Sequence, residues 1–352
     1  MNKLLNVGDK MIIINDFFKR RKEAVSNQME LIAKDNNCEI VAATRFMGQK
    51  TLQEEDLKDK IYVYSPYQYP FKIIKHLKFS YGIIHIFEEQ PSKFKEIVFN
   101  LTRRPVYVSL YRMPSSKECE HLKKYKNLKG IFVELELHKN KLINKGFDSS
   151  IIHITPTPTK FERKKSDKIF DPNNINILFA SWNMAEGKPL YDRGLIYLLE
   201  LLETNKFLYL TVILRDKNIE DFVEELNNRK LANRVEMIDV KTDKELEKIF
   251  EKCDFVAFPA QKRIVKDVPN SLIDGLCKGK PVIISDVLNF SEIVTNKNIG
   301  FVVKNGGEKI NLNISKENYE ELSNNAFEYS EMHSKENYVK IIKKGYVKNG
   351  RI

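Results

Sequence analysis

The chain has 352 residues, more than one hydrophobic core usually serves, so two domains are expected. Its 42% hydrophobic and 30% charged residues are ordinary for a globular protein, and no apolar run reaches the roughly 18 residues of a membrane-spanning helix. The polar start MNKLLNVGDK is not typical of a secretory signal, which makes a cytoplasmic location the expectation.

The positive charge is concentrated in the first half of the chain. Residues 1–165 hold 31 Lys or Arg against 19 Asp or Glu, a net +12, whereas the remainder holds 28 against 29, a net −1. The first half is therefore expected to face an anionic partner such as phospholipid headgroups or a phosphorylated acceptor, unless the lysines reflect composition alone. A nucleic-acid-binding protein is a further alternative from charge, but no such motif is found and no nucleic acid is expected. The four cysteines form no CxxC pair, so reduced core thiols and no metal site are predicted.

In the first half, apolar strand-like runs alternate with helical patterns, which favours a parallel sheet with crossover helices. The predicted strands cover residues 11–15, 39–44, 61–65, 83–87, 106–110, 130–134 and 151–154. The predicted helices cover residues 21–35, 71–79, 91–101, 119–125 and 138–145. In the helix over 71–79, Lys72, Lys75 and Lys78 share one face. That face is predicted either to be solvated or to contact anionic lipid at the inner face of a membrane.

Residues 155–174, polar and rich in Pro and Lys, are the predicted linker. The alternation then restarts, with strands over 175–180, 208–214, 235–237 and 255–258 and helices over 194–204, 219–229 and 242–250. The charged segment 316–348 is predicted to be helical. We therefore expect a first domain over 1–160, a second over 170–326, and a terminal helical segment over 327–352 that crosses back to the first.

The stretch VPNSLIDGLCKGKPVIISD, residues 268–286, combines a helix start, a helix and a buried strand. Asn270 or Ser271 is the predicted N-cap, and Gly279 ends the helix before the apolar run 282–284. Free backbone N–H groups and the positive end of the helix dipole at such a start favour a bound phosphate.

This stretch and the following NFSEIVTNKNIGFVV resemble the donor-site signature of GT-B glycosyltransferases of the retaining, glycogen-synthase-like group. The order of the first-half runs YGIIHIFEE and RPVYVSLYR is similar to that of the same family. The resemblance implies an α/β fold of two Rossmann-like domains whose parallel sheets face across a cleft. It also implies sugar transfer from a nucleotide-sugar donor with retention of configuration and without a metal or cofactor. The first domain would hold an acceptor, which its charge suggests is anionic or lipid-linked.

Roles for single residues follow from the resemblance. The family carries two acidic residues around the helix start. The second falls on Asp274, a predicted acceptor for hydrogen bonds from the ribose hydroxyls. The first falls on Lys266, which is not acidic, although Asp267 is adjacent. Arg193, just before Gly194, is the predicted cation for the distal phosphate. The further donor-side candidates are Asn270, Ser271, Lys262 and Arg263.

Each of these roles has a plainer alternative. Asp274 can instead form an exposed ion pair with Lys278, Asp267 can cap its loop, and Arg193 can be a surface residue at a helix start.

The first domain departs from the family pattern at two places. The loop NDFFKRRKE has no glycine, and its Lys19, Arg20 and Arg21 replace backbone donors, face an anionic acceptor or form a solvated turn. Tyr111 stands where the family places a His, and both Tyr111 and Lys19 are possible cleft residues. His85 is a candidate cleft residue, with a hydrogen-bonded structural histidine as the alternative. Three alternatives remain open. The departures favour a catalytically silent GT-B partner protein, and the shared architecture also allows a sugar-nucleotide epimerase or a phosphorylase.

Overall fold

The computed structural model describes residues 11–15, 24–43, 60–65, 67–79, 82–88, 91–181, 190–214, 219–263, 266–304 and 307–348. The chain forms two compact units: unit 1 contains Met1–Pro156 and Lys335–Ile352, and unit 2 contains Thr157–Ser334. Residues 157–160 and 327–334, which the sequence assigns to the first domain and the terminal segment, therefore belong to unit 2. Within the described ranges, no helix is both long and apolar enough to cross a bilayer.

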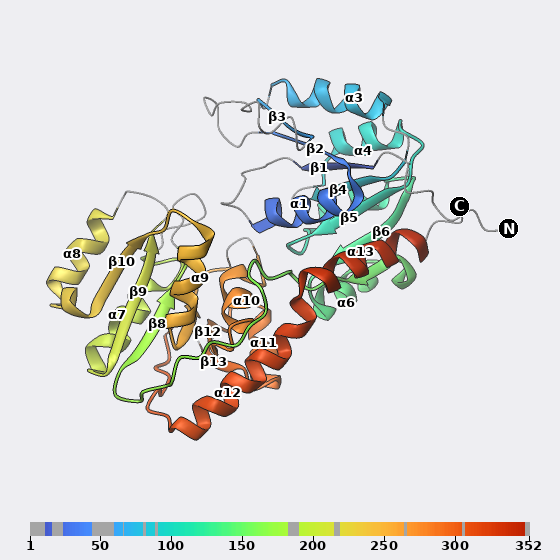
Figure 1. Cartoon of the computed structure of the whole chain (residues 1–352). Helices are drawn as coiled ribbons and strands as arrows, with labels where there is room; N and C mark the ends of the chain where they lie inside the picture. The colour runs from blue at the N-terminus through green and yellow to red at the C-terminus, as the bar shows by residue number, and fades with distance from the viewer. Residues whose placement is uncertain are drawn as a thin grey trace. The chain divides into compact units, whose positions relative to one another are not determined.

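The described part of unit 1 is built on a seven-stranded parallel sheet in the order β3-β2-β1-β4-β5-β6-β7 (Figure 1). The strands are β1 (Ile12–Asn15), β2 (Glu39–Ala43), β3 (Ile61–Tyr64), β4 (Ile84–Glu88), β5 (Val106–Leu110), β6 (Leu128–Val133) and β7 (Ile152–Ile154). The central strands β1, β2 and β5 are buried on both faces, as parallel sheets covered by helices require, whereas the edge strands β3 and β7 are partly exposed.

Helices cover both faces of this sheet. The main core cluster joins one face to α3 (Tyr69–Phe79), α4 (Lys93–Asn100), α5 (Ser116–Lys123) and α6 (Glu136–Asn144). On the opposite face, α13 (Lys335–Lys348) packs on β6 and β7 and also contacts α1 (Ala24–Asn36). The end of the chain is thus part of the core of unit 1, as the red helix α13 in Figure 1 shows.

His85 lies at the centre of the contact between α13 and the sheet. Its side chain is fully buried, Nδ1 lies 2.5 Å from the Tyr346 hydroxyl, and Nε2 lies 2.8 Å from Ser109 Oγ. The ring also stacks on Phe87, with 4.9 Å between the centroids. The predicted cleft role of His85 is therefore wrong, because its side chain points to the face that α13 covers. The alternative, a hydrogen-bonded structural histidine, is correct.

The burial of His85 predicts a pH-dependent stability of unit 1. Burial lowers the pKa of His85 to about 3, whereas an unfolded histidine has a pKa of about 6.5. As the pH falls below about 6.5, His85 takes up a proton in the unfolded chain but not in the folded chain, so the free energy of unfolding decreases. Between pH 7.5 and pH 5 we expect a loss of about 2 kcal/mol from this residue in urea unfolding. His85→Gln, which cannot titrate, is expected to flatten the dependence by this amount, and equal slopes in the two proteins would contradict the assignment.

Unit 2 contains, in the described residues, a six-stranded parallel sheet in the order β10-β9-β8-β11-β12-β13. The strands are β8 (Ile175–Phe179), β9 (Leu208–Leu214), β10 (Val235–Asp239), β11 (Phe255–Phe258), β12 (Val282–Ser285) and β13 (Gly300–Val303). The helices are α7 (Leu195–Thr204), α8 (Glu220–Asn228), α9 (Asp243–Lys252), α10 (Asn270–Leu276), α11 (Phe290–Asn296) and α12 (Lys316–Tyr329). These elements lie at the positions that the alternating sequence pattern predicts.

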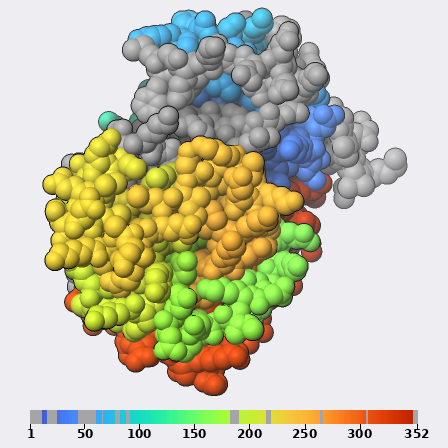
Figure 2. Space-filling view, turned by 60° about the vertical axis from the view of Figure 1, so that its left-hand side comes forward, coloured from blue at the N-terminus to red at the C-terminus, as the bar shows by residue number. Residues whose placement is uncertain are grey.

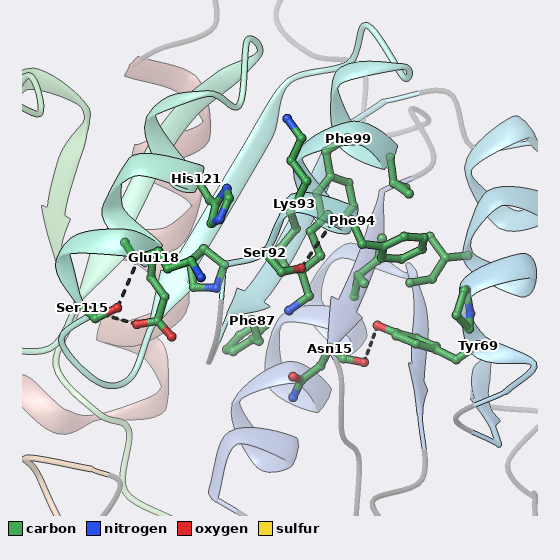
Figure 3. A pocket seen from close by; sticks show the side chains of 18 residues that line it. Asn15, Tyr69, Phe87, Ser92, Lys93, Phe94, Phe99, Ser115, Glu118 and His121 are labelled. Carbon is green, nitrogen blue, oxygen red and sulfur yellow. Dashed lines mark hydrogen bonds between the residues drawn. The ribbon is translucent and has the colours of Figure 1, made fainter.

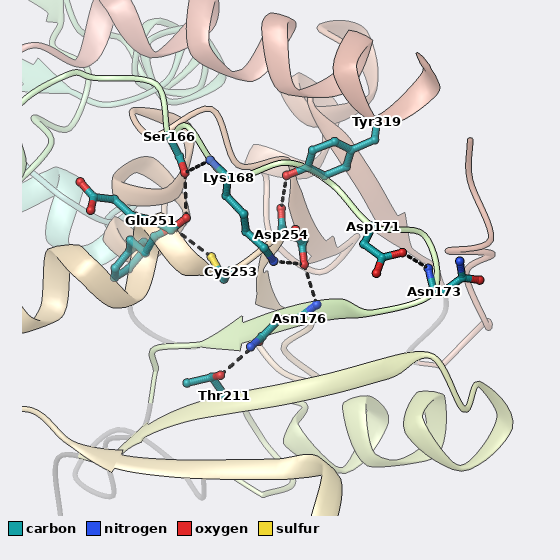
Figure 4. A network of polar contacts seen from close by, with 11 residues as sticks. Ser166, Lys168, Asp171, Asn173, Asn176, Thr211, Glu251, Cys253, Asp254 and Tyr319 are labelled. Atoms are coloured by element: carbon teal, nitrogen blue, oxygen red, sulfur yellow. Dashed lines mark hydrogen bonds and ion pairs between the residues drawn. The ribbon is translucent and has the colours of Figure 1, made fainter. Parts of the chain in front are cut away.

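The predicted linker is a packed segment of unit 2 over most of its length (Figure 4). Phe170 stacks on Tyr319 with 3.9 Å between the ring centroids, and both rings are buried. Lys168 forms an ion pair with the buried Asp254, whose Oδ2 also accepts a hydrogen bond of 2.7 Å from the backbone N–H of Asn176. Burial nevertheless raises the pKa of Asp254. Pro and Lys content misled the prediction because a single buried aromatic side chain is enough to fix such a segment to a core.

Candidate functional site in unit 2 and a pocket in unit 1

Both sheets have a point at which the strand order reverses. In unit 1 it lies between β1 and β4, and in unit 2 between β8 and β11. Loops that follow the two strands diverge at such a point and leave a crevice at the carboxyl ends of the strands, where ligands bind in open parallel sheets. The residues at these two switch points are therefore the first candidates for function.

Gly194 fixes the loop before α7 at the switch point of unit 2. It has φ +80°, and a Cβ at this position would lie 1.8 Å from the Pro259 carbonyl oxygen. The backbone N–H of Gln261 also donates to the Asp192 carbonyl, at 2.9 Å. The loops after β8 and β11 are therefore in direct backbone contact, which a residue with a side chain at 194 would prevent.

Arg193 is held at this contact. Its Nη1 donates to the Ser181 carbonyl at 3.1 Å, and the guanidinium lies 5.8 Å from the ring centroid of Phe258. The side chain is only 6% exposed, so the alternative of a surface residue at a helix start is wrong. The structure places this cation just beyond the ends of β8 and β11. Its role toward a phosphate remains a prediction.

Helix α10 starts next to Ser181, whose carbonyl accepts the hydrogen bond from Arg193. Ser271 Oγ lies 3.3 Å from Ser181 Oγ. The N-cap is Pro269, not Asn270 or Ser271, and it supplies no side-chain cap to the helix. Lys266 Nζ donates to Asn270 Oδ1 at 2.7 Å and to Thr157 Oγ1 at 3.0 Å. Ser181, Arg193 and Ser271 thus converge from three segments, and we call them the switch-point cluster.

Asp274 is buried and faces the segment that enters unit 2. Its Oδ1 accepts hydrogen bonds from Thr159 Oγ1 at 3.1 Å and from the Lys160 N–H at 2.7 Å. The exposed pair with Lys278 is wrong, because both side chains are buried and Lys278 forms ion pairs with Glu247 and Glu251. The ribose role stays a prediction, and the contacts to residues 159 and 160 show how this carboxylate is positioned.

The remaining donor-side candidates lie in the loop between β11 and α10. Lys262 forms an ion pair with Asp192 at 2.8 Å, and Arg263 forms one with Asp267 at 2.6 Å. Asp267 is buried, whereas both cations are largely exposed. The contact with Arg263 fits the alternative in which Asp267 stabilises its own loop, and direct contacts of these residues with a donor remain predictions.

A pocket of about 660 Å³ lies at the switch point of unit 1 (Figure 3). The apolar residues Ile14, Ile86 and Phe87 line it from the sheet. Tyr69 closes one side and donates from its hydroxyl to the Asn15 carbonyl at 2.6 Å. The rest of the lining comes from α3, from α4 and from the start of α5, and it includes Lys93, Lys95, Lys117, Glu118 and His121. The pocket is therefore apolar within and largely basic at its helical edge.

The sequence did not single out this pocket. Ser92 and Ser115, which cap α4 and α5, were the available signals, since helix starts after parallel strands mark the ligand-binding edge of a sheet. Tyr111, a predicted cleft residue, follows β5, is largely buried and is not among the pocket-lining residues. Lys19, Arg20 and Arg21 lie outside the described residues.

The comparisons with known proteins concern both units. Residues 191–329 match the model of the family described as glycosyl transferases group 1, a range that includes Arg193, Gly194 and all of α10. The crystal structure of Anabaena HepE in complex with UDP and glucose matches with a TM-score of 0.72 at 15% identity, over 95% of this chain and 98% of that chain. A glycosyltransferase from Rickettsia africae has a TM-score of 0.67 at 17% identity, over 96% and 98% of the two chains. The sucrose-phosphate synthase of Thermosynechococcus elongatus has a TM-score of 0.69 at 11% identity, also over 96% and 98%.

No protein with a curated description matches the sequence. At these identities the structural matches establish the fold, and the group 1 match supports a glycosyltransferase. The predicted fold is confirmed: the chain has the GT-B fold of two Rossmann-like units, and its residues 191–329 match the model of glycosyl transferases group 1.

Proposed function

We propose that this protein transfers a sugar from a nucleotide-sugar donor held by unit 2 to an acceptor held by unit 1. The observation that carries the proposal is the overlap of the group 1 match with the switch-point cluster, where the Gly194–Pro259 contact fixes the buried Arg193. Support for the donor class comes from HepE, whose matching structure contains UDP and glucose.

The chemistry assigned to unit 2 is electrostatic. When the bond between the anomeric carbon and the distal phosphate breaks, negative charge develops on the phosphate oxygens. A cation already in place stabilises this charge without reorganisation, and a guanidinium can bind two oxygens at once. Arg193 takes this role in the proposal, Asp274 binds the ribose, and Lys266 and Asp267 lie toward the sugar. Retention of configuration and independence of a metal belong to the same proposal and follow from the family resemblance.

The pocket in unit 1 is the proposed acceptor site. It combines apolar walls with the lysines at positions 93, 95 and 117, which suits an acceptor that has both an apolar and an anionic part. Asn15 lines the pocket, and among the described residues its buried Oδ1 has no hydrogen-bond partner, so an acceptor hydroxyl would satisfy it.

A thermal-shift screen with UDP-, GDP- and ADP-sugars tests the donor proposal, because a ligand that binds the native state raises its melting temperature. At 100 times Kd the gain is about 2.7 kcal/mol, a shift of several degrees. The donor that shifts the temperature is then expected to release its nucleoside diphosphate slowly in water. A donor that binds without release supports the catalytically silent partner protein, and the absence of any shift contradicts donor binding altogether.

A further inference from the structure

Helix α4 carries an apolar stripe on its solvent side. Phe94, Ile97 and Leu101 follow one another at i, i+3 and i+7 and are 44%, 50% and 78% exposed. The opposite side of the helix buries Val98 and Phe99 in the core of unit 1. The helix is therefore apolar on both sides, and the core explains only one of them.

Helix α3 repeats this arrangement beside α4. It buries Tyr69, Ile73 and Leu77 in the same core cluster. Its outer side exposes Phe71 at 76% and Ile74 at 41%, and Tyr67 just before the helix is 72% exposed. Figure 2 shows α3, in light blue at the top, at the molecular surface.

The two helices that carry these exposed side chains are neighbours. Both helices cover the same sheet face and line the same pocket, and Arg104 Nη1 donates to the Leu77 carbonyl at the end of α3. Six of the twelve large hydrophobic residues that are exposed among the described residues lie here. We call Tyr67, Phe71, Ile74, Phe94, Ile97 and Leu101 the α3–α4 patch.

The two segments that carry the α3–α4 patch are mostly basic. The segments 67–77 and 91–104 contain six Lys or Arg and one acidic residue, Glu96. Glu96 is buried, with its carboxylate 2.8 Å from Lys93 Nζ and 3.2 Å from His121 Nδ1, so it faces inward. Lys75, which follows Ile74 on α3, is exposed. An apolar surface with a basic border is the result.

We infer that unit 1 docks on an anionic lipid bilayer through the α3–α4 patch. Exposed Phe, Ile and Leu with neighbouring lysines match the apolar and anionic layers of such a surface. A protein partner fits less well, because lysine is depleted in protein interfaces relative to the rest of the surface. The sequence also allowed α3 to have a face that only contacts solvent, but this alternative does not explain why Phe71 and Ile74 are exposed.

This inference goes beyond sugar transfer and does not depend on it. If the proposed function also holds, Phe94 belongs both to the α3–α4 patch and to the pocket lining, so an acceptor that resides in the bilayer reaches the pocket along this helix.

Vesicle flotation with the full chain tests the inference without any activity assay. We expect the protein to float with vesicles of phosphatidylcholine containing about 30% phosphatidylglycerol, and much less with phosphatidylcholine alone, with binding that weakens as salt is added. The double variant Ile97→Ser/Leu101→Ser and the variant Lys75→Glu are each expected to lower the apparent affinity at least about fivefold.

Two matched controls separate the patch from general hydrophobicity and charge. Ile169→Ser removes an equally exposed side chain of unit 2, and Lys129→Glu reverses an exposed charge of unit 1, and both are expected to bind as the unaltered chain does. Melting temperatures of all variants check that they fold. Equal flotation with both vesicle types, or unchanged binding in the patch variants, would overturn the inference. A dimer in light scattering that the patch variants dissociate, without vesicle binding, would assign the patch to a second copy of the chain and would also overturn it.

Discussion

Replacing Arg193 by alanine is expected to lower kcat/KM for sugar transfer by about 10² to 10³-fold, the usual cost of removing one preorganised group that stabilises charge in the transition state. The reduction is expected mainly in kcat, because the charge on the distal phosphate develops as the bond breaks. Arg193→Lys is expected to recover only part of the loss, since a lysine supplies a point charge without the fork of N–H donors. Initial rates over a range of donor concentrations give this comparison.

The control must remove a partly buried, hydrogen-bonded guanidinium without touching the switch-point cluster. Arg163 serves this purpose: it donates to Ser330 Oγ at 3.1 Å and to the Phe327 carbonyl at 2.8 Å, and it lies over the Phe327 ring. Arg163→Ala is expected to lower the melting temperature and to leave kcat nearly unchanged. If Arg193→Ala and Arg163→Ala lose the same activity, or if Arg193→Ala loses none, Arg193 does not act on the phosphate.

Gly194→Ala is expected to destabilise unit 2 by about 2 to 5 kcal/mol, the largest stability effect that we predict for one methyl group. Two costs add. The residue has φ +80°, a conformation that a side chain disfavours by about 1 to 2 kcal/mol. The new Cβ also meets the Pro259 carbonyl, and moving this carbonyl away costs about 1 to 3 kcal/mol. Because relief requires the loops after β8 and β11 to separate, Arg193 would also move, and activity is expected to fall at temperatures where the variant is still folded.

Gly307→Ala is the matched control, since among the described residues, chain neighbours aside, no atom lies within 4 Å of a Cβ at that position. Its free energy of unfolding in urea is expected to change by less than about 1 kcal/mol. A Gly194→Ala variant as stable as Gly307→Ala would show that the loop contact with Pro259 is not as close as described.

Most of the fold follows from the sequence, because most strands are short apolar runs and most helices have an apolar stripe toward the core. The ends of elements are less predictable where several signals compete. Asn270 and Ser271 are both good N-caps, yet α10 begins after Pro269, whose fixed φ suits the position. Residues 155–174 show a second limit: their composition is that of a linker, and the packing of Phe170 on Tyr319 depends on a residue nearly 150 positions away.

The candidate site was predictable where a motif is local and not where it is built from distant segments. The Arg193–Gly194 pair could be found in the sequence. The contact with Pro259, which explains why residue 194 is a glycine, could not be found, because it joins two loops that follow different strands. His85 illustrates the opposite error. Its position in a strand was clear, but only the packing of Tyr346 on the sheet shows which face it points to. The pocket in unit 1 has no single motif, since strands and helices across more than 100 residues line it.

The most direct test of the account is a crystal structure of this chain with the nucleoside diphosphate that the thermal-shift screen selects. We predict that the phosphates bind at the switch-point cluster, with the distal phosphate hydrogen-bonded to the Arg193 guanidinium and the ribose on the side of Asp274. A nucleotide bound in the pocket of unit 1, or bound in unit 2 with Arg193 out of contact with both phosphates, would contradict the account.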